Sequence, residues 1–296
     1  MIRRLAAALL AGVPAACSPL GLFATLVPQD RAVRVARDVA YGAGERRRLD
    51  VYAPRARGGR ARPVIVFFYG GSWASGSRRD YGWVGRALAA QGFVVAVPDY
   101  RLVPEGRYPG FVEDGAAAVA YVRGHAAAWG GDGGRILLAG HSAGAYIAAM
   151  LAVDPRWLGD GRTAVRGLIG LAGPYDFAPF DVAASRAAFG HWPDAAETQP
   201  VSHAGAGDPP ALLLSGADDR TVQPRNTQAL AARLRAGGVA AEVKLYPGIA
   251  HVGILTALAR PLRGRAPVLR DMAAFAHRVT AGAAPQATSN GTPEAD

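Results

Sequence analysis

Gly140-His141-Ser142-Ala143-Gly144 is the stretch of sequence that decides the fold. The aliphatic run from Ile136 to Ala139 comes directly before it, and an apolar segment from Ala143 to Val153 follows. The first run predicts a buried strand and the second a helix, so the serine lies in a tight strand-to-helix turn. Only small residues fit beside a serine in such a turn, which accounts for the two glycines. The turn holds the Ser142 hydroxyl clear of the backbone, at the positive end of the helix dipole, and makes it a candidate nucleophile.

Strand-like and helix-like patterns alternate on both sides of this turn. Strands are expected at residues 48–52, 64–68, 93–97, 136–139, 167–172, 211–214 and 241–245. Helices are expected at residues 84–91, 112–128, 143–153, 223–236 and 268–279. This alternation predicts an α/β fold with a mostly parallel central sheet flanked by helices. The segment 48–52 alternates apolar and polar residues and is expected at the sheet edge, whereas 64–68 is apolar throughout and is expected at the centre.

Length and composition indicate one large globular domain. The chain has 296 residues, of which 50% are hydrophobic and 19% are charged, and we place the domain at residues 33–280. The tail at 281–296 is rich in Ala, Thr, Pro and Gly, so we expect it to be disordered. The formal net charge of +10 comes almost entirely from arginine. Because these arginines are scattered and form no stripe with aromatic residues, the pattern argues against a nucleic-acid partner.

A long connection joins the strands expected at 167–172 and 211–214. It runs from Gly173 to Asp208 and carries Phe177, Phe180, Phe189 and Trp192. Long loops in compact domains are usually functional, so one interpretation is a small cap over the site. The alternative is that these aromatic residues simply pack against the core.

A serine nucleophile needs a histidine base and an acid that orients the histidine. After a turn of this kind the acid comes next along the chain and the histidine last. Only His251 and His277 follow a suitable acid, and His277 falls inside an expected helix. His251 is expected in a loop just past the last strand, so it is the candidate base. His141 adjoins the serine, and we expect it to have a structural role.

Two aspartates compete for the role of the acid. Asp218 and Asp219 lie side by side directly after the strand at 211–214. Loops at the carboxyl ends of parallel strands are where such a sheet presents its chemistry. Either carboxylate could therefore fix the tautomer of the histidine and stabilise the imidazolium.

Backbone N–H groups are the expected donors to the oxyanion. One donor is the residue after the serine, Ala143. The loop after the strand at 64–68 reads Tyr69-Gly70-Gly71-Ser72-Trp73, and its glycine pair lets the backbone approach a substrate closely. We assign the other donors to Gly71 and Ser72. This machinery needs no metal ion and no organic cofactor.

The N-terminus has the features of an export signal. Arg3 and Arg4 precede an apolar run from Leu5 to Val13, and Pro14-Ala15-Ala16-Cys17 follows. Residues 1–17 resemble a bacterial lipoprotein signal, which implies lipidation of Cys17. Pro14 departs from that pattern, in which a leucine-like residue is usual. A cleaved signal, an uncleaved anchor and a cytoplasmic chain remain alternatives. Cys17 is the only cysteine, so neither an internal disulfide nor a cysteine metal site can form.

Several motifs together resemble one enzyme family. These are Tyr69-Gly-Gly-Ser-Trp73, Pro98-Asp-Tyr-Arg-Leu102, Gly140-His-Ser-Ala-Gly144 and the loops around residues 219 and 251. They look like α/β-hydrolase esterases akin to hormone-sensitive lipase. Within these, the chain is most similar to the feruloyl/acetyl-xylan-esterase-like (BD-FAE-like) branch, with kynurenine formamidase and prenylcysteine methylesterase as neighbours. The resemblance covers roughly Val35 to Val279 and implies the α/β-hydrolase fold.

The resemblance also bears on single residues. Related enzymes resemble G-x-x-D-x-x-V after this strand, which matches Gly216, Asp219 and Val222 and favours Asp219 as the acid. The family usually has histidine where this chain has Tyr69. That departure weakens the inference that this chain shares the family's substrate more than the inference that it is active.

The expected function is a serine carboxylic ester hydrolase that acts on a small or medium ester through an acyl-enzyme. An aryl formamidase or another amidase would use the same triad, and a non-catalytic binding protein on this scaffold is a further alternative. The expected partner is a small-molecule ester, with a membrane contacted only through the N-terminal anchor. The sequence does not specify the acyl group, the alcohol group or the oligomeric state.

Overall fold

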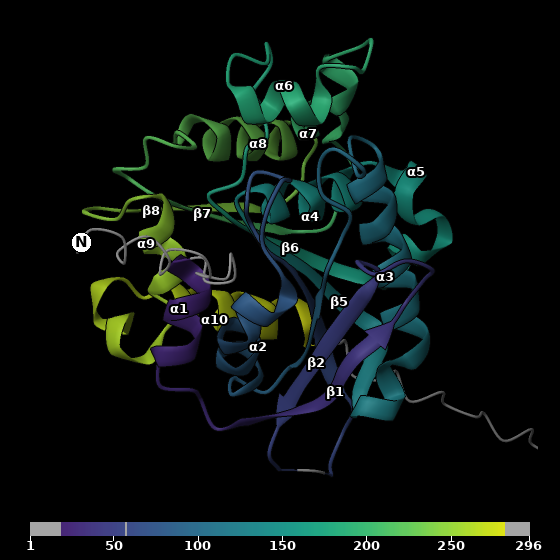
Figure 1. Cartoon of the computed structure of the whole chain (residues 1–296), viewed down its shortest axis with the longest axis vertical. Coiled ribbons are helices and arrows are strands. Elements are labelled where there is room, and N and C mark those ends of the chain that lie inside the picture. The colour runs from purple at the N-terminus through teal and green to yellow at the C-terminus, as the bar shows by residue number, and fades with distance from the viewer. Residues whose placement is uncertain (1–18, 57, 282–296) are drawn as a thin grey trace, which may run out of the picture.

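One sheet of eight strands forms the centre of the protein (Figure 1). The computed structural model describes residues 19–56 and 58–281. The strand order is β1-β2-β4-β3-β5-β6-β7-β8. The strands are β1 (Ala32–Ala40), β2 (Arg48–Pro54), β3 (Arg62–Phe68), β4 (Val94–Pro98), β5 (Gly131–His141), β6 (Val165–Leu171), β7 (Ala211–Gly216) and β8 (Ala241–Tyr246). Strand β2 runs antiparallel to both of its neighbours, and all pairs from β4 to β8 are parallel.

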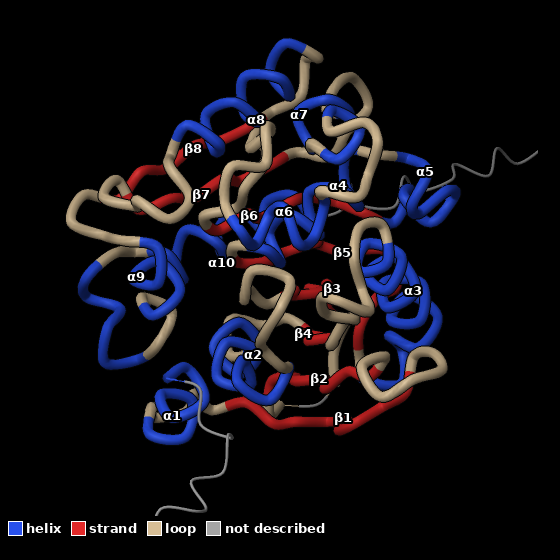
Figure 2. Tube along the Cα trace, turned by 45° about the horizontal axis from the view of Figure 1, so that its top comes forward, coloured by secondary structure: helices blue, strands red, loops and turns tan. Residues whose placement is uncertain are grey.

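Helices cover both faces of this sheet. They are α1 (Pro19–Leu26), α2 (Gly82–Ala89), α3 (Gly110–His125), α4 (Ala143–Val153), α5 (Pro155–Leu158), α6 (Ala183–Phe189), α7 (Pro200–His203), α8 (Arg225–Ala236), α9 (His251–Thr256) and α10 (Val268–Thr280). Figure 2 shows α2 and α10 on one side of the strands and α3 on the other. Helix α4 packs on α3 and against β5 and β6. This arrangement confirms the predicted α/β fold.

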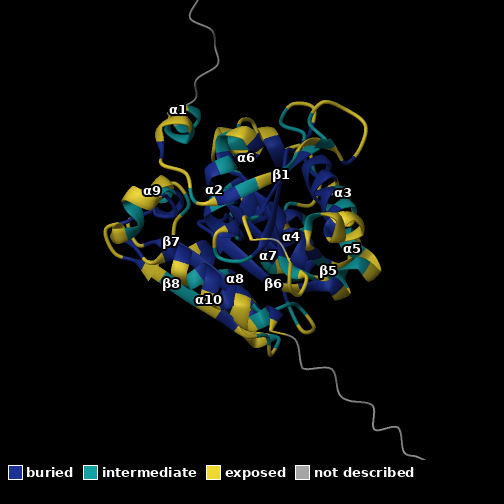
Figure 3. Ribbon diagram, turned by 90° about the horizontal axis from the view of Figure 1, so that it is seen from below, coloured by how far each residue is buried: buried dark blue, intermediate teal, exposed yellow. Residues whose placement is uncertain are grey.

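The core lies between the sheet and these helices. The strands β3 and β4 are apolar and almost wholly buried, as expected for a parallel sheet covered on both faces. Helix α4 is buried along its whole length, because β5, β6 and α3 surround it. Figure 3 shows the buried strands at the centre and exposed outer faces on the helices.

The predicted position of β2 at the sheet edge is wrong. Strand β1 pairs with its outer side, so β2 is internal and its five central residues are buried. The sequence does not predict β1, because two register shifts interrupt the alternation of inward and outward side chains along it. These shifts lie between Arg34 and Ala36 and between Ala36 and Val39. Strand β1 begins at Ala32, and α1 precedes the boundary that we placed at residue 33. The tail from 282 lies outside the described residues.

The connection from 173 to 208 contains short helices rather than an extended loop. Helices α6 and α7 fall within it, and a short 3₁₀ helix, Ala196–Thr198, lies between them. Figure 1 places α6 and α7 over α4 and α8. Across residues 19–56 and 58–281, no helix has the length and hydropathy needed to span a bilayer.

Candidate active site

The Ser142 turn has the strained geometry that its sequence predicts. Ser142 has φ of 54° and ψ of −124°, a region that non-glycine residues rarely occupy, at the junction of β5 and α4. A Cβ atom on Gly140 would lie 2.4 Å from backbone atoms of Gly144. A Cβ atom on Gly144 would lie 2.1 Å from the carbonyl oxygen of Phe68. Both glycines are therefore required by close packing, and the turn presents the serine side chain at the carboxyl edge of the sheet.

Three of the predicted residues form one hydrogen-bonded chain. The Nε2 atom of His251 lies 2.9 Å from the Oγ atom of Ser142. The Nδ1 atom of the same ring lies 2.7 Å from the Oδ2 atom of Asp219. These residues follow β5, β7 and β8, so the parallel sheet brings together side chains more than a hundred positions apart. The arrangement can abstract a proton from the serine hydroxyl and stabilise the resulting imidazolium.

The acid is ionised and firmly held. Burial alone would raise the pKa of the Asp219 carboxyl, but hydrogen bonds from His251 and from the backbone N–H groups of Val222 and Thr221 lower it below its usual value. Asp219 is buried, whereas Asp218 is exposed and its side chain makes no hydrogen bond within the described chain. The geometry therefore brings Asp219 to the histidine and leaves Asp218 outside.

The local setting of His251 differs from the expected loop. His251 is the first residue of α9, and only the segment from Pro247 to Ala250 is non-helical. The sequence does not predict this short helix because its six residues include a glycine and three β-branched residues, which have low helix propensity. His277 lies within α10, as expected, and bonds to the carbonyl oxygen of Gln91.

The predicted oxyanion donors lie in the loop after β3 and at the start of α4. Gly71, Ser72 and Trp73 all have positive φ, which turns the loop sharply. In the described part of the chain, the N–H groups of Gly71 and Ser72 have no protein acceptor. Ala143 occupies the first position of α4, where a helix leaves N–H groups without an intrahelical partner. Three N–H groups near the serine thus remain available to a negative oxygen.

His141 is buried, and its side chain makes one hydrogen bond within the described residues. Its Nε2 atom lies 3.1 Å from the carbonyl oxygen of His251, and the two rings are 5.0 Å apart. Burial, followed by the neighbouring His251, lowers the pKa of His141 to about 3, although Asp219 acts in the opposite direction. The residue is therefore neutral, and the structural role expected for it is consistent with its contacts.

Tyr69 anchors the loop after β3 to a buried charged network. Burial, with Asp99 second, raises the pKa of the Tyr69 hydroxyl well above its usual value, so it stays protonated. The hydroxyl donates to Asp99 at 3.0 Å and accepts from Arg46 at 2.8 Å. Arg78 also bonds to Asp99 and to Asp50. Tyr69 thus makes a bond to Asp99 at the position where the family usually has histidine.

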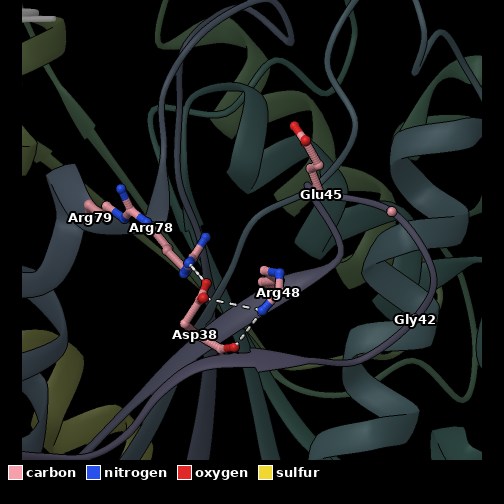
Figure 4. Close-up of a pocket in the computed structure, with 7 residues that line it drawn as sticks. Asp38, Gly42, Glu45, Arg48, Arg78 and Arg79 are labelled. Carbon is pink, nitrogen blue, oxygen red and sulfur yellow. Dashed lines mark hydrogen bonds and ion pairs between the residues drawn. The ribbon is translucent and has the colours of Figure 1, made fainter.

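Sequence reasoning missed Arg78 and its carboxylate partners. Arg78 is buried and also bonds to Asp38, which in turn pairs with Arg48 (Figure 4). These charges border a polar pocket of about 500 Å³ beside the β1–β2 hairpin. The one signal that could have found them is Pro98-Asp-Tyr-Arg-Leu102, a motif that contains Asp99.

An aromatic cluster lies next to the candidate oxyanion donors. The ring of Trp73 packs edge-on against Phe189 at 4.8 Å and against Tyr146 at 5.5 Å. It stacks on Phe177 and Phe111, both at 6.0 Å. Tyr146 lies one turn after Ser142 in α4, so the cluster borders the nucleophile. The aromatic residues of the segment 173–208 pack against the core, as one of the two interpretations predicts. A cap over the site stays a prediction.

Among residues 19–56 and 58–281, no group of three or more His, Cys, Asp or Glu side chains is arranged to hold a metal ion. Cys17, the predicted lipidation site, lies outside the described residues.

Comparison with known proteins gives one family and several relatives. The model of the BD-FAE family matches residues 49–234. A probable isoprenylcysteine alpha-carbonyl methylesterase of Arabidopsis thaliana is 31% identical over 255 residues, which cover 78% of this chain and 53% of that protein. The esterase LipC of Mycobacterium tuberculosis is 31% identical over 221 residues, which cover 68% of this chain and 55% of that protein. The chain thus spans about half the length of these relatives.

A solved structure supports the fold independently. A truncated carbohydrate esterase from gut microbiota superposes with a TM-score of 0.74 at 21% identity, covering 86% of this chain and 98% of that one. At this level of identity the similarity shows the α/β-hydrolase fold.

Proposed function

The chain belongs to the BD-FAE family, and from that premise we propose that it is a serine carboxylic ester hydrolase acting on a small or medium ester. The observation that carries the proposal is the hydrogen-bonded chain from Ser142 through His251 to Asp219. The names of the two relatives, a methylesterase and an esterase, support ester hydrolysis rather than amide hydrolysis.

The proposed reaction passes through an acyl-enzyme. His251 removes the proton of the Ser142 hydroxyl as the oxygen attacks the ester carbonyl carbon. The N–H groups of Gly71, Ser72 and Ala143 stabilise the negative oxygen of the tetrahedral intermediate. The intermediate collapses, the bond to the alcohol breaks, and His251 returns its proton to the departing alkoxide.

A water molecule completes the cycle. It attacks the acyl carbon while His251 takes one of its protons, and the proton then passes to the Ser142 oxygen as the carboxylic acid leaves. Asp219 remains ionised throughout and stabilises the imidazolium, in keeping with its lowered pKa. No other group needs to change its charge.

The substrate class is supported by the aromatic cluster around Trp73. Trp73 directly follows the candidate donors Gly71 and Ser72 and packs against Phe177 and Phe189, so the surroundings of these donors are apolar, which favours an ester with an apolar acyl or alcohol group. Hydrolysis of p-nitrophenyl acetate tests the function directly, followed by a panel of feruloyl and longer acyl esters and an aryl formamide. Turnover of the formamide alone would replace the ester proposal with the amidase. Failure to hydrolyse any of these substrates, together with no labelling by a fluorophosphonate, would refute a serine hydrolase.

We also propose that the protein is exported and anchored to the cell envelope by lipid on Cys17. The support is entirely in the sequence, namely Arg3-Arg4, the short apolar run and the small residues before the cysteine. In this proposal the folded domain contacts the membrane only through that anchor.

A further inference from the structure

We propose that His141 is a positioning residue that holds both the catalytic histidine and the oxyanion loop in register with Ser142. The oxyanion loop is defined here as Tyr69 to Trp73. This inference deepens the proposed function and rests on it. Its starting point is that one buried ring bonds to the backbone of His251 and lies against Gly70, while its residue directly precedes Ser142, although the ring takes no part in the proton transfers.

One edge of the ring holds the segment that carries His251. The Nε2 atom of His141 lies 3.1 Å from the carbonyl oxygen of His251. A carbonyl oxygen can only accept, so the Nε2 atom carries the hydrogen and donates. Because His251 is the first residue of α9 and follows four non-helical residues, this bond fixes the backbone at the point where the catalytic side chain leaves it.

The other edge of the ring lies against the oxyanion loop. A Cβ atom on Gly70 would be 3.0 Å from the Nδ1 atom of His141 and 3.0 Å from the Cβ atom of Ser142. Gly70 therefore packs directly on both residues. Its own N–H donates to the hydroxyl of Tyr81 at 3.2 Å, which holds the loop from the opposite side.

A histidine at position 141 lowers the stability of the folded state. Its Nδ1 atom is buried and has no hydrogen-bond partner within the described residues. An unpaired buried acceptor is destabilising, and a leucine of similar size would avoid it. Its low pKa also means that the ring stays neutral near neutral pH, and the bond to the carbonyl oxygen of His251 sets its tautomer. An imidazole can donate the hydrogen bond to the carbonyl oxygen of His251 from its Nε2 atom, whereas an aliphatic side chain cannot.

Catalysis is sensitive to such positioning. A displacement of about 1 Å of a catalytic group can reduce the rate about a hundredfold. Loss of the bond between His141 and the carbonyl of His251 should therefore lower kcat by about 10- to 100-fold while KM changes by less than about threefold.

Three variants at one position test this inference. His141→Leu removes the donor, His141→Gln places an amide nitrogen near the Nε2 position, and His141→Asn is too short to reach the carbonyl. The matched control is His277→Leu, because the Nε2 atom of His277 also bonds to a backbone carbonyl, that of Gln91 at 2.9 Å, away from the triad. The readouts are kcat and KM for p-nitrophenyl acetate and the rate of labelling by a fluorophosphonate.

The inference predicts that Leu and Asn lower kcat and the labelling rate together, that Gln restores most of both, and that the His277 control leaves both unchanged. Wild-type kcat in His141→Leu would overturn it, as would equal impairment of the Gln and Asn variants. If the Leu variant does not fold, the contrast between Gln and Asn decides. Failure of the proposed function is distinct, because the wild-type protein would then show neither hydrolysis nor labelling.

Discussion

The Nδ1 atom of His251 lies 2.7 Å from the Oδ2 atom of Asp219, and the side chain of Asp219 is buried. The neighbouring Asp218 is exposed and contributes nothing to this contact. A difference of one residue in sequence thus separates a carboxylate that can orient the histidine from one that cannot.

Replacement of these two aspartates should give unequal effects. Asp219→Asn should lower kcat by roughly 10³- to 10⁴-fold, because an amide no longer holds the histidine in the required tautomer or stabilises the imidazolium. Asp218→Asn is the matched control and should leave kcat within about twofold, since the side chain is solvated. Steady-state kinetics on p-nitrophenyl acetate measure both. Greater damage in the Asp218 variant would shift the acid by one residue.

The network around Tyr69 should contribute measurably to stability. Tyr69→Phe removes the hydroxyl that bridges Arg46 and Asp99, and should lower the free energy of unfolding by about 1–3 kcal/mol. Tyr121→Phe is the control, because the described structure gives the Tyr121 hydroxyl no hydrogen bond, and its effect should stay within about 0.5 kcal/mol. Urea denaturation followed by fluorescence measures both. Equal stability of the two variants would contradict the role given to the network.

His141 should make folding stability depend on pH. Its folded-state pKa of about 3 lies below the ordinary value of 6.5. Between these values the unfolded chain binds a proton at this position and the folded chain does not, so stability falls as the pH falls. His141→Gln removes this dependence. The free energy of unfolding of the wild type, relative to the variant, should therefore decrease by up to about 1.4 kcal/mol per pH unit below about pH 6.

Urea denaturation of both proteins at pH 7, 6 and 5 checks this difference. His251 and Asp219, the titratable groups that face His141, are present in both proteins, so their own contributions largely cancel. Parallel stability curves would show that His141 is not held neutral by its surroundings.

Much of the site could be predicted from local sequence. The Gly140–Gly144 turn is specified by neighbouring residues alone, because the close approach of Gly140 to Gly144 tolerates no side chain. The parallel strands could be predicted because they are continuous apolar runs, and Ser142, Asp219 and His251 follow three of them. A strand end is a local feature, and the sheet then gathers such ends at one edge.

Other features depend on contacts that a linear pattern does not contain. Strand β1 could not be predicted because its register shifts remove the alternation of apolar and polar residues. The predicted position of β2 at the sheet edge was wrong for that reason. The partners of Arg78 come from the segments around residues 38, 50 and 99. Likewise, the bond from His141 to the carbonyl of His251 joins positions 110 apart and involves a backbone atom, which carries no sequence signal.

The proposed lipid anchor makes a prediction about mass and location. Mature protein should begin at Cys17, carry the mass of its lipid chains and partition with membranes, because several acyl chains on one residue bind stably. Cys17→Ser should leave the precursor unprocessed or release soluble protein. Intact mass of the native protein measures this. A chain that starts elsewhere without lipid would contradict the anchor and leave the hydrolase proposal untouched.

The most direct test of the central claim is the esterase activity of Ser142→Ala beside the wild type. The account predicts that the wild type hydrolyses p-nitrophenyl acetate and is labelled by a fluorophosphonate at Ser142. It predicts that the variant loses about 10⁴- to 10⁶-fold in kcat, because only binding and the oxyanion donors remain. The thermal unfolding of the variant should match that of the wild type. A folded Ser142→Ala variant with near wild-type turnover would contradict the account.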